Sequence, residues 1–246
     1  MSRLVDAGPS SPSPSPSTSN ADRSALAVAW YRLVQVVLGM LFMISGGLRA
    51  TGRRNVPRRG AAILVSNHLS HLDVLVLGLL LHRPLNYVAR STLFLPVLGP
   101  LIRSVGAFPI QREGMGASGL KETLRRLRNG GMVTLFPEGT RSRDGELAEL
   151  KTGIAVLVAR AKVPIVPAAV AGTFEAWPRD RTLPRPYPTR AHFGPPIVPA
   201  DLEGRSTAAI TDLIRDRIQE CHRIAEQGVA RDLGGGGNCD WPGGPF

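Results

Sequence analysis

A histidine and an aspartate five positions apart, His68 and Asp73, form the first cluster that could do chemistry. Both follow the apolar run Ala61–Val65, which is typical of a buried strand, so they are expected at the end of a sheet where ligands usually bind. The pair predicts a dyad in which His68 takes a proton from a hydroxyl while Asp73 fixes the tautomer of its ring.

The same residues also fit a purely structural interpretation. Ser70 and Asp73 resemble a variant of the capping box at the start of a helix. Asn67 and His71 would then be ordinary polar residues of the loop. A continuous helix would not bring His68 and Asp73 together, whereas a turn that leads into a helix would.

A second cluster, Phe136–Ser142, again follows an apolar strand pattern, Met132–Phe136. Gly139 permits a tight backbone, and Arg141 could bind phosphate because its planar guanidinium donates two hydrogen bonds at once. The alternative is a solvated turn that an internal pair between Glu138 and Arg141 holds together.

Two further segments accompany these clusters. The strand pattern Val105–Ile110 is followed by Arg112, which would add a cation at the same sheet edge or be an ordinary exposed arginine. In the segment Val163–Pro167, two prolines bracket a short strand, and proline is poorly tolerated in central strands. We therefore expect these prolines to shape a strand start and a bulge.

Apolar runs alternate with helical patterns from about residue 60 to 200, which predicts an α/β fold with helices flanking a central mixed sheet. Leucines 120, 124 and 127 predict a helix that ends before Gly130. An amphipathic helix is expected over residues 207–225. The predicted organisation is a disordered Ser/Pro-rich tail (1–24), a membrane-associating helix with a basic segment (25–59), a catalytic domain (60–231) and a flexible Gly-rich tail (232–246).

The membrane prediction rests on residues 26–48, which are apolar apart from a few positions such as Arg32 and Gln35, and on the arginines that follow. Such a helix would span the bilayer or lie in its interface, on the anionic cytoplasmic side of the inner or plasma membrane. The alternative is a buried helix of the soluble domain. The net charge of +11 favours an anionic partner, although a bias in codon usage toward arginine would also explain it.

Taken in order, the four segments resemble the glycerolipid acyltransferase family, whose best-known branch is the 1-acylglycerol-3-phosphate acyltransferases. The resemblance covers about residues 50–200 and includes a His-x4-Asp block and the block Phe-Pro-Glu-Gly-Thr-Arg. It implies that His68 is the general base and Asp73 its orienting partner. It also implies residues that bind substrate, namely Arg112, Glu138, Gly139, Thr140 and Arg141, with Asn67, Ser70, Lys151 and Pro167 as further candidates.

The implied reaction moves an acyl group from acyl-CoA or an acyl carrier protein to a lysophospholipid, with no permanently bound cofactor, no metal and no nucleic acid. The sequence departs from the family at Pro109, at Gln111 where Asp is frequent, and at Leu150 where Phe is frequent. These departures leave glycerol 3-phosphate or another lysolipid open as the acceptor. A serine hydrolase would need a Gly-x-Ser-x-Gly elbow, which the sequence lacks. A basic, non-enzymatic binder of membranes would not explain two charged blocks at strand ends.

Overall fold

The computed structural model describes residues 46–91, 106–110 and 116–234, together with isolated positions at 29–30, 32–33, 35–36, 39–40, 99 and 102–103. The predicted tail 1–24, the last residues from 235 onward and Arg112 lie outside these ranges.

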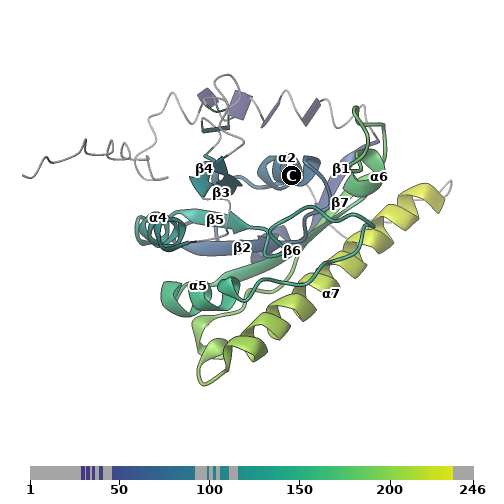
Figure 1. The fold of residues 1–246 in the computed structure, drawn as a ribbon. Helices are drawn as coiled ribbons and strands as arrows, with labels where there is room; N and C mark the ends of the chain where they lie inside the picture. The colour runs from purple at the N-terminus through teal and green to yellow at the C-terminus, as the bar shows by residue number, and fades with distance from the viewer. Residues whose placement is uncertain are drawn as a thin grey trace, which may run out of the picture.

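Within the described residues, seven strands form one mixed sheet (Figure 1), in the order β1-β7-β6-β2-β5-β3-β4. Neighbouring strands run parallel except for β6 and β7, which are antiparallel. The predicted α/β class with a mixed sheet is therefore confirmed. The strands are β1 (Leu48–Thr51), β2 (Ala62–Ser66), β3 (Leu85–Arg90), β4 (Phe108–Ile110), β5 (Met132–Leu135), β6 (Ile165–Ala171) and β7 (Thr189–Phe193).

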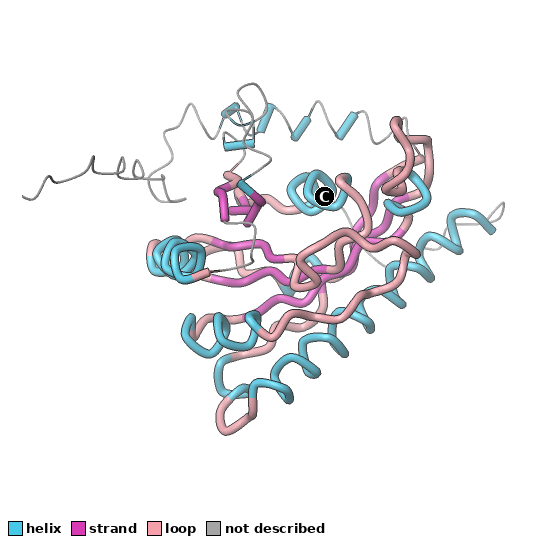
Figure 2. The backbone as a smooth tube through the Cα atoms, in the orientation of Figure 1, coloured by secondary structure: helices cyan, strands magenta, loops and turns pink. Residues whose placement is uncertain are grey.

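Helices cover both faces of this sheet (Figure 2), as the alternating pattern predicts. Helix α2 packs on one face, and α4, α5 and α7 pack on the other. The helices are α2 (Leu72–Leu80), α4 (Ala117–Arg128), α5 (Gly153–Ala161), α6 (Thr173–Ala176) and α7 (Thr207–Gly234), with short 3-10 turns η1 (Arg53–Asn55) and η3 (Pro199–Leu202).

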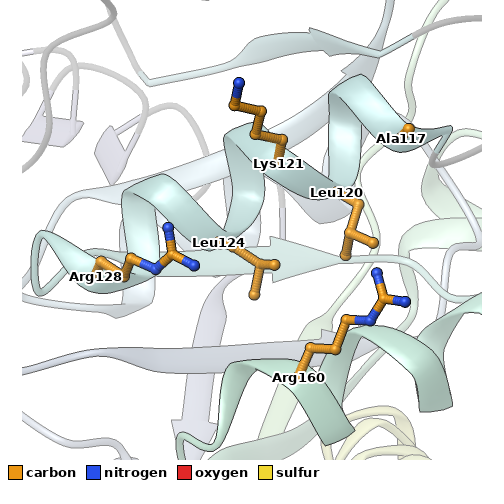
Figure 3. A pocket seen from close by; sticks show the side chains of 6 residues that line it. All are labelled: Ala117, Leu120, Lys121, Leu124, Arg128 and Arg160. Atoms are coloured by element: carbon orange, nitrogen blue, oxygen red, sulfur yellow. The ribbon is translucent and has the colours of Figure 1, made fainter.

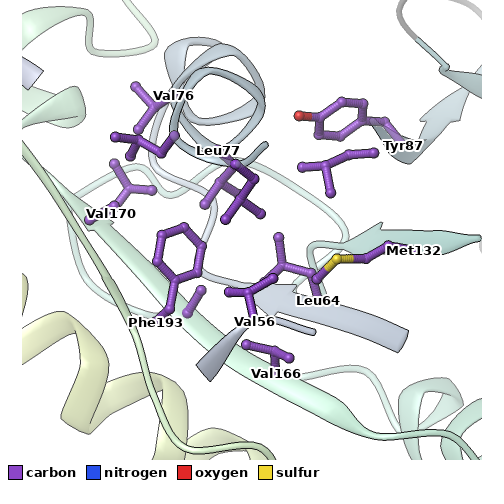
Figure 4. Close-up of a cluster of buried hydrophobic side chains, with 14 of the residues drawn as sticks. Val56, Leu64, Val76, Leu77, Tyr87, Met132, Val166, Val170 and Phe193 are labelled. Atoms are coloured by element: carbon purple, nitrogen blue, oxygen red, sulfur yellow. The ribbon is translucent and has the colours of Figure 1, made fainter. Parts of the chain in front are cut away.

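Strand β2 is buried on both sides, which explains its unbroken apolar sequence. Its side chains alternate between two cores: Leu64 contributes to the cluster under α2 (Figure 4), whereas Ile63 and Val65 contribute to the cluster under α5 and α7. Because β2 pairs in parallel with β5 and β6, the C-terminal ends of these three strands lie side by side. This edge positions the candidate site.

The sheet extends further than the sequence patterns indicate. Strand β1 lies inside the predicted basic segment 25–59, and β7 follows a loop rich in proline and arginine, residues 179–188. Both are short strands interrupted by polar residues (LRAT and TRAHF), so neither has the apolar run by which the inner strands are recognised. Helix α7 runs to Gly234, beyond the predicted end at residue 225.

The described part of the N-terminal helix turns its polar side chains toward the domain. Arg32 donates to the carbonyl oxygen of His82 (2.5 Å), and Gln35 donates to that of Gly78 (2.6 Å). Four large apolar side chains on a different face are 45–59% exposed: Trp30, Leu33, Val36 and Met40. No helix among the described residues has the length and apolarity to cross a bilayer.

Candidate functional site

The structure brings His68 and Asp73 together. Nδ1 of His68 lies 3.0 Å from Oδ2 of Asp73, in the turn that leads from β2 into α2. The same Oδ2 accepts the backbone N–H groups of Leu69 (2.7 Å) and Ser70 (2.8 Å), and Oδ1 accepts the hydroxyl of Thr173 (2.6 Å). Because Oδ2 of Asp73 accepts these hydrogen bonds, the neutral imidazole of His68 is expected to carry its proton on Nδ1 and to leave Nε2 unprotonated.

The two sequence interpretations of Asp73 are both realised in one side chain. Asp73 lies in the first turn of α2 and accepts the N–H of Ser70, as in a capping box, while Ser70 Oγ accepts the N–H of Leu72 at 3.3 Å. The carboxylate is 0% exposed. One network of hydrogen bonds around Asp73 thus both caps the helix and orients the imidazole.

The loop after β5 holds the backbone of His68. The N–H of His68 donates to Oε1 of Glu138 (2.7 Å), and the carbonyl oxygen of His68 accepts the N–H of Ser142 (2.7 Å). The imidazole also stacks on Phe136, with ring centroids 4.1 Å apart. The side chain of His68 remains 17% exposed, so the clamped ring can still meet a substrate.

Glu138 is buried, with 3% exposed, and does not form the ion pair with Arg141 that was one sequence interpretation. Its carboxylate instead receives two backbone N–H groups, from His68 (2.7 Å) and Ala148 (3.0 Å). Burial raises the pKa of Glu138 to about 7, and the two N–H donors oppose that shift. The solvated-turn interpretation is therefore wrong for Glu138.

The rest of this loop depends on Gly139, which has φ of +71°. A Cβ at this position would lie 2.7 Å from Cε of Lys151, so the lysine stem passes directly over the turn. The N–H of Lys151 donates to the carbonyl oxygen of Pro137 (3.0 Å). The stem of Lys151 is thus held at the loop, in which Thr140 is exposed, and the predicted contact of both residues with substrate stays a prediction.

Arg141 and His71 share an electrostatic environment beside the dyad. Burial lowers the pKa of Arg141, as does the neighbouring Arg179, whereas Asp73 and Asp180 act in the opposite direction. Burial also lowers the pKa of His71, and Arg141 and His68 add to this effect. Arg141 therefore presents a fixed cation at the site, whereas His71 is held in its neutral form at pH 7.

Two other predicted site residues have structural partners. The amide of Asn67 bridges to the backbone of Val170 through two hydrogen bonds of 2.9 Å, and Ser70 Oγ donates to the carbonyl oxygen of Trp177 (2.8 Å). Both side chains are fully buried. Their predicted contact with substrate stays a prediction, but Asn67 joins the dyad turn to β6 itself, and Ser70 joins it to Trp177, which follows β6.

Pro167 lies inside β6, with its carbonyl oxygen accepting the N–H of Gly194 (2.8 Å). Between the pair Ala168–Phe193 and the bridge Ile165–Ile197, two residues of β6 face the three residues 194–196. The extra residue of this bulge lies on the segment opposite β6, so the role predicted for Pro167 in forming a bulge stays a prediction. The predicted role of Pro167 in substrate binding also stays a prediction.

Thr173 and Trp177 are site residues that sequence reasoning misses. Thr173 holds the second oxygen of Asp73, and Trp177 contacts His71 edge-on, with ring centroids 5.9 Å apart. Both follow β6, about one hundred positions from the dyad. Only the pairing of β6 with β2 brings Thr173 and Trp177 near the dyad, and no local sequence motif predicts that pairing.

A hollow of about 200 Å³ lies elsewhere, between α4 and α5 (Figure 3). Its floor includes Leu120 and Leu124, and three cations line it: Lys121, Arg128 and Arg160. It contains none of the sequence-predicted site residues, so the site is defined by the strand ends and not by this cavity.

The raised pKa of Glu138 predicts a specific dependence of stability on pH. Because the folded pKa lies above the unfolded value of 4.5, the stabilisation is fully present below about pH 4.5 and is lost as the pH rises through about 7. As the pH rises from 4.5 to 8, the unfolding free energy of the parent should therefore fall by up to about 3 kcal/mol relative to that of Glu138→Gln. Urea denaturation at several pH values measures this difference, and parallel pH profiles for the two proteins would contradict the assignment.

Comparison with known proteins agrees with this geometry. Residues 47–171 match the family model described as Acyltransferase. A 1-acyl-sn-glycerol-3-phosphate acyltransferase of Bacillus subtilis is 28% identical over 80% of this chain and 99% of its own length. Another from Limnanthes alba is 30% identical over 80% of this chain and 75% of its own length. The chain spans 59% of a third such protein, from Limnanthes douglasii, at 31% identity.

A solved structure shows the same fold. The crystal structure of the 1-acyl-sn-glycerophosphate (LPA) acyltransferase PlsC from Thermotoga maritima aligns with a TM-score of 0.68, covering 85% of this chain and 81% of that chain at 21% identity. The family match includes both the dyad turn and the loop after β5. The chain therefore belongs to the Acyltransferase family.

Proposed function

We propose that this protein transfers a fatty acyl group from an acyl thioester, acyl-CoA or an acyl carrier protein, to the free hydroxyl of 1-acylglycerol 3-phosphate, which gives phosphatidic acid. The observation that carries the proposal is the dyad of His68 and Asp73, clamped beside Arg141 at one sheet edge. The names of the similar proteins, all 1-acylglycerol-3-phosphate acyltransferases, support this acceptor.

The proposed mechanism needs no covalent enzyme intermediate. Nε2 of His68 takes the proton from the acceptor hydroxyl as its oxygen attacks the thioester carbonyl carbon. The tetrahedral intermediate then collapses, the carbon–sulfur bond breaks, and the leaving thiolate takes the proton from the imidazolium. Asp73 stabilises that imidazolium and keeps the ring oriented throughout.

Arg141 is proposed to bind the acceptor phosphate. It follows the turn at Gly139, and the loop that carries it is tied to His68 through Ser142. It forms no hydrogen bond or ion pair with any residue that the structure describes, so its donors are available for a ligand. A guanidinium close to the base would hold the acceptor by its phosphate while the hydroxyl reaches Nε2.

We also propose that the N-terminal helix lies on the cytoplasmic face of a membrane. The exposed apolar side chains Trp30, Leu33, Val36 and Met40 lie on a different face from Arg32 and Gln35, which bind the C-terminal end of α2. The basic segment reaches the same end, because Arg53 donates to the carbonyl oxygen of Leu80 (2.8 Å). Helix α2 has nine residues and is therefore about 14 Å long, so a membrane held there would lie near the dyad.

Acyl transfer by the purified full chain tests the reaction directly. With lysophosphatidic acid, monoacylglycerol and glycerol 3-phosphate as acceptors and both donor types, we expect the fastest transfer to lysophosphatidic acid. His68→Ala should lower kcat by roughly 10²- to 10⁴-fold, the range for loss of a general base.

His71→Ala is the matched control, since His71 lies in the same turn and makes only an edge contact with Trp177. It should cost far less than His68→Ala. Equal rates with lysophosphatidic acid and monoacylglycerol, or a fully active His68→Ala enzyme, would refute the proposed reaction.

The membrane proposal is tested with vesicles of phosphatidylglycerol and phosphatidylcholine. A double variant, Leu33→Ser with Val36→Ser, should weaken binding at least about 10-fold, because each buried aliphatic side chain contributes about 1.5 kcal/mol or more. The control replaces two apolar residues that are exposed elsewhere, Leu183→Ser with Val198→Ser. If both double variants bind alike, or if high salt alone releases the parent, the helix does not insert.

A further inference from the structure

The segment after α6 forms a turn that is fixed against the dyad. The N–H of Arg181 donates to the carbonyl oxygen of Pro178 (3.2 Å), which closes a turn with Arg179 and Asp180 at its tip. The indole N–H of Trp177 donates to the carbonyl oxygen of Arg181 (2.8 Å) and braces the turn from the side. The position of Arg179 is therefore restricted by two hydrogen bonds that do not involve its own side chain.

This turn is tied to the catalytic region at its base. The carbonyl oxygen of Trp177 accepts the hydroxyl of Ser70 (2.8 Å), and its ring contacts His71. Earlier in the chain than this turn, the hydroxyl of Thr173 donates to Oδ1 of Asp73. In addition, a Cβ placed on Gly145, which belongs to the loop that carries Arg141, would lie 3.3 Å from the ring of Phe174. The turn therefore borders both the dyad and the proposed phosphate loop.

Arg179 and Arg141 are neighbouring cations beside the dyad. Arg179 is exposed, and neither arginine forms a hydrogen bond or an ion pair within the described part of the chain. Their guanidinium groups are close enough that Arg179 lowers the pKa of Arg141. Asp73 and Asp180 oppose this effect, but the carboxylate of Asp73 is already occupied by four donors. Two neighbouring cations with open donors form a site for an anion with several oxygens.

We infer that Arg179 is a further phosphate-binding residue, which shares the phosphate of the acceptor with Arg141. The inference rests on the proposed acyl transfer to a phosphorylated lysolipid. Two guanidinium groups match a phosphate monoester, which can carry two negative charges and three terminal oxygens. A phosphodiester lysolipid carries one charge and a bulky substituent. Arg179 would thus favour monoesters over diesters.

Steady-state kinetics of the full chain test this role. Arg179→Ala should raise KM for lysophosphatidic acid about 10-fold, as expected for one charge-assisted hydrogen bond at a partly solvated site, and change kcat and the donor KM by less than about 2-fold. Arg179→Lys should recover only part of the affinity, because an ammonium lacks the planar fork. When Arg141→Ala is already present, Arg179→Ala should raise KM for lysophosphatidic acid by less than it does in the parent, since residues that share a ligand are coupled.

Arg181→Ala is the matched control, because it removes the same charge from the same turn while keeping the backbone groups that close it. Its KM for lysophosphatidic acid should stay within about 2-fold of the parent, well below the effect of one charge-assisted hydrogen bond. An unchanged KM in Arg179→Ala, or an equal rise in Arg181→Ala, would overturn the inference while the parent activity still supports the reaction.

Calorimetric titration with glycerol 3-phosphate separates the inference from the reaction. If the parent fails to acylate lysophosphatidic acid, the proposed function fails, but the anion site can still be measured by binding. Arg179→Ala should then weaken binding of glycerol 3-phosphate about 10-fold and Arg181→Ala should not. Equal binding by parent and Arg179→Ala would reject the two-arginine site whatever the reaction.

Discussion

The carboxylate of Asp73 accepts hydrogen bonds from the ring of His68, the N–H groups of Leu69 and Ser70, and the hydroxyl of Thr173. A buried carboxylate is costly unless its oxygens are satisfied, so these four donors must meet at one point for the fold to form. Their convergence sets the path of the turn after β2, the start of α2 and the approach of α6. The orientation of the imidazole follows from the same requirement.

The second constraint is the clamp on the backbone of His68. Glu138 and Ser142, both on the loop after β5, bind the N–H and carbonyl groups of this one residue. The parallel pairing of β2 with β5 and β6 makes the clamp possible, because it brings three strand ends to one edge. The loop that carries Arg141 is therefore tied to His68 through two hydrogen bonds. We expect this coupling to align the acceptor hydroxyl with Nε2.

Local sequence patterns predict the inner strands and the ends where His68 and Glu138 lie, because apolar runs and turn residues are local signals. They do not choose between capping and catalysis for Asp73, since both need a carboxylate at the same place. No local sequence pattern marks Thr173 as a site residue, because its contact with Asp73 depends on pairing between strands that are distant in sequence. The edge strand β1 is missed because two of its four residues, Arg49 and Thr51, are polar, so it contains no apolar run.

The protonation of the two ring nitrogens of His68 tests the central claim most directly. Nitrogen-15 NMR of the neutral form of the ring in the parent should show the proton on Nδ1 and Nε2 unprotonated, because Asp73 accepts from Nδ1. In Asp73→Asn the amide can donate to Nδ1, so the proton should move to Nε2 in at least part of the population. A parent ring protonated on Nε2 alone, or an unchanged tautomer in Asp73→Asn, would contradict the account.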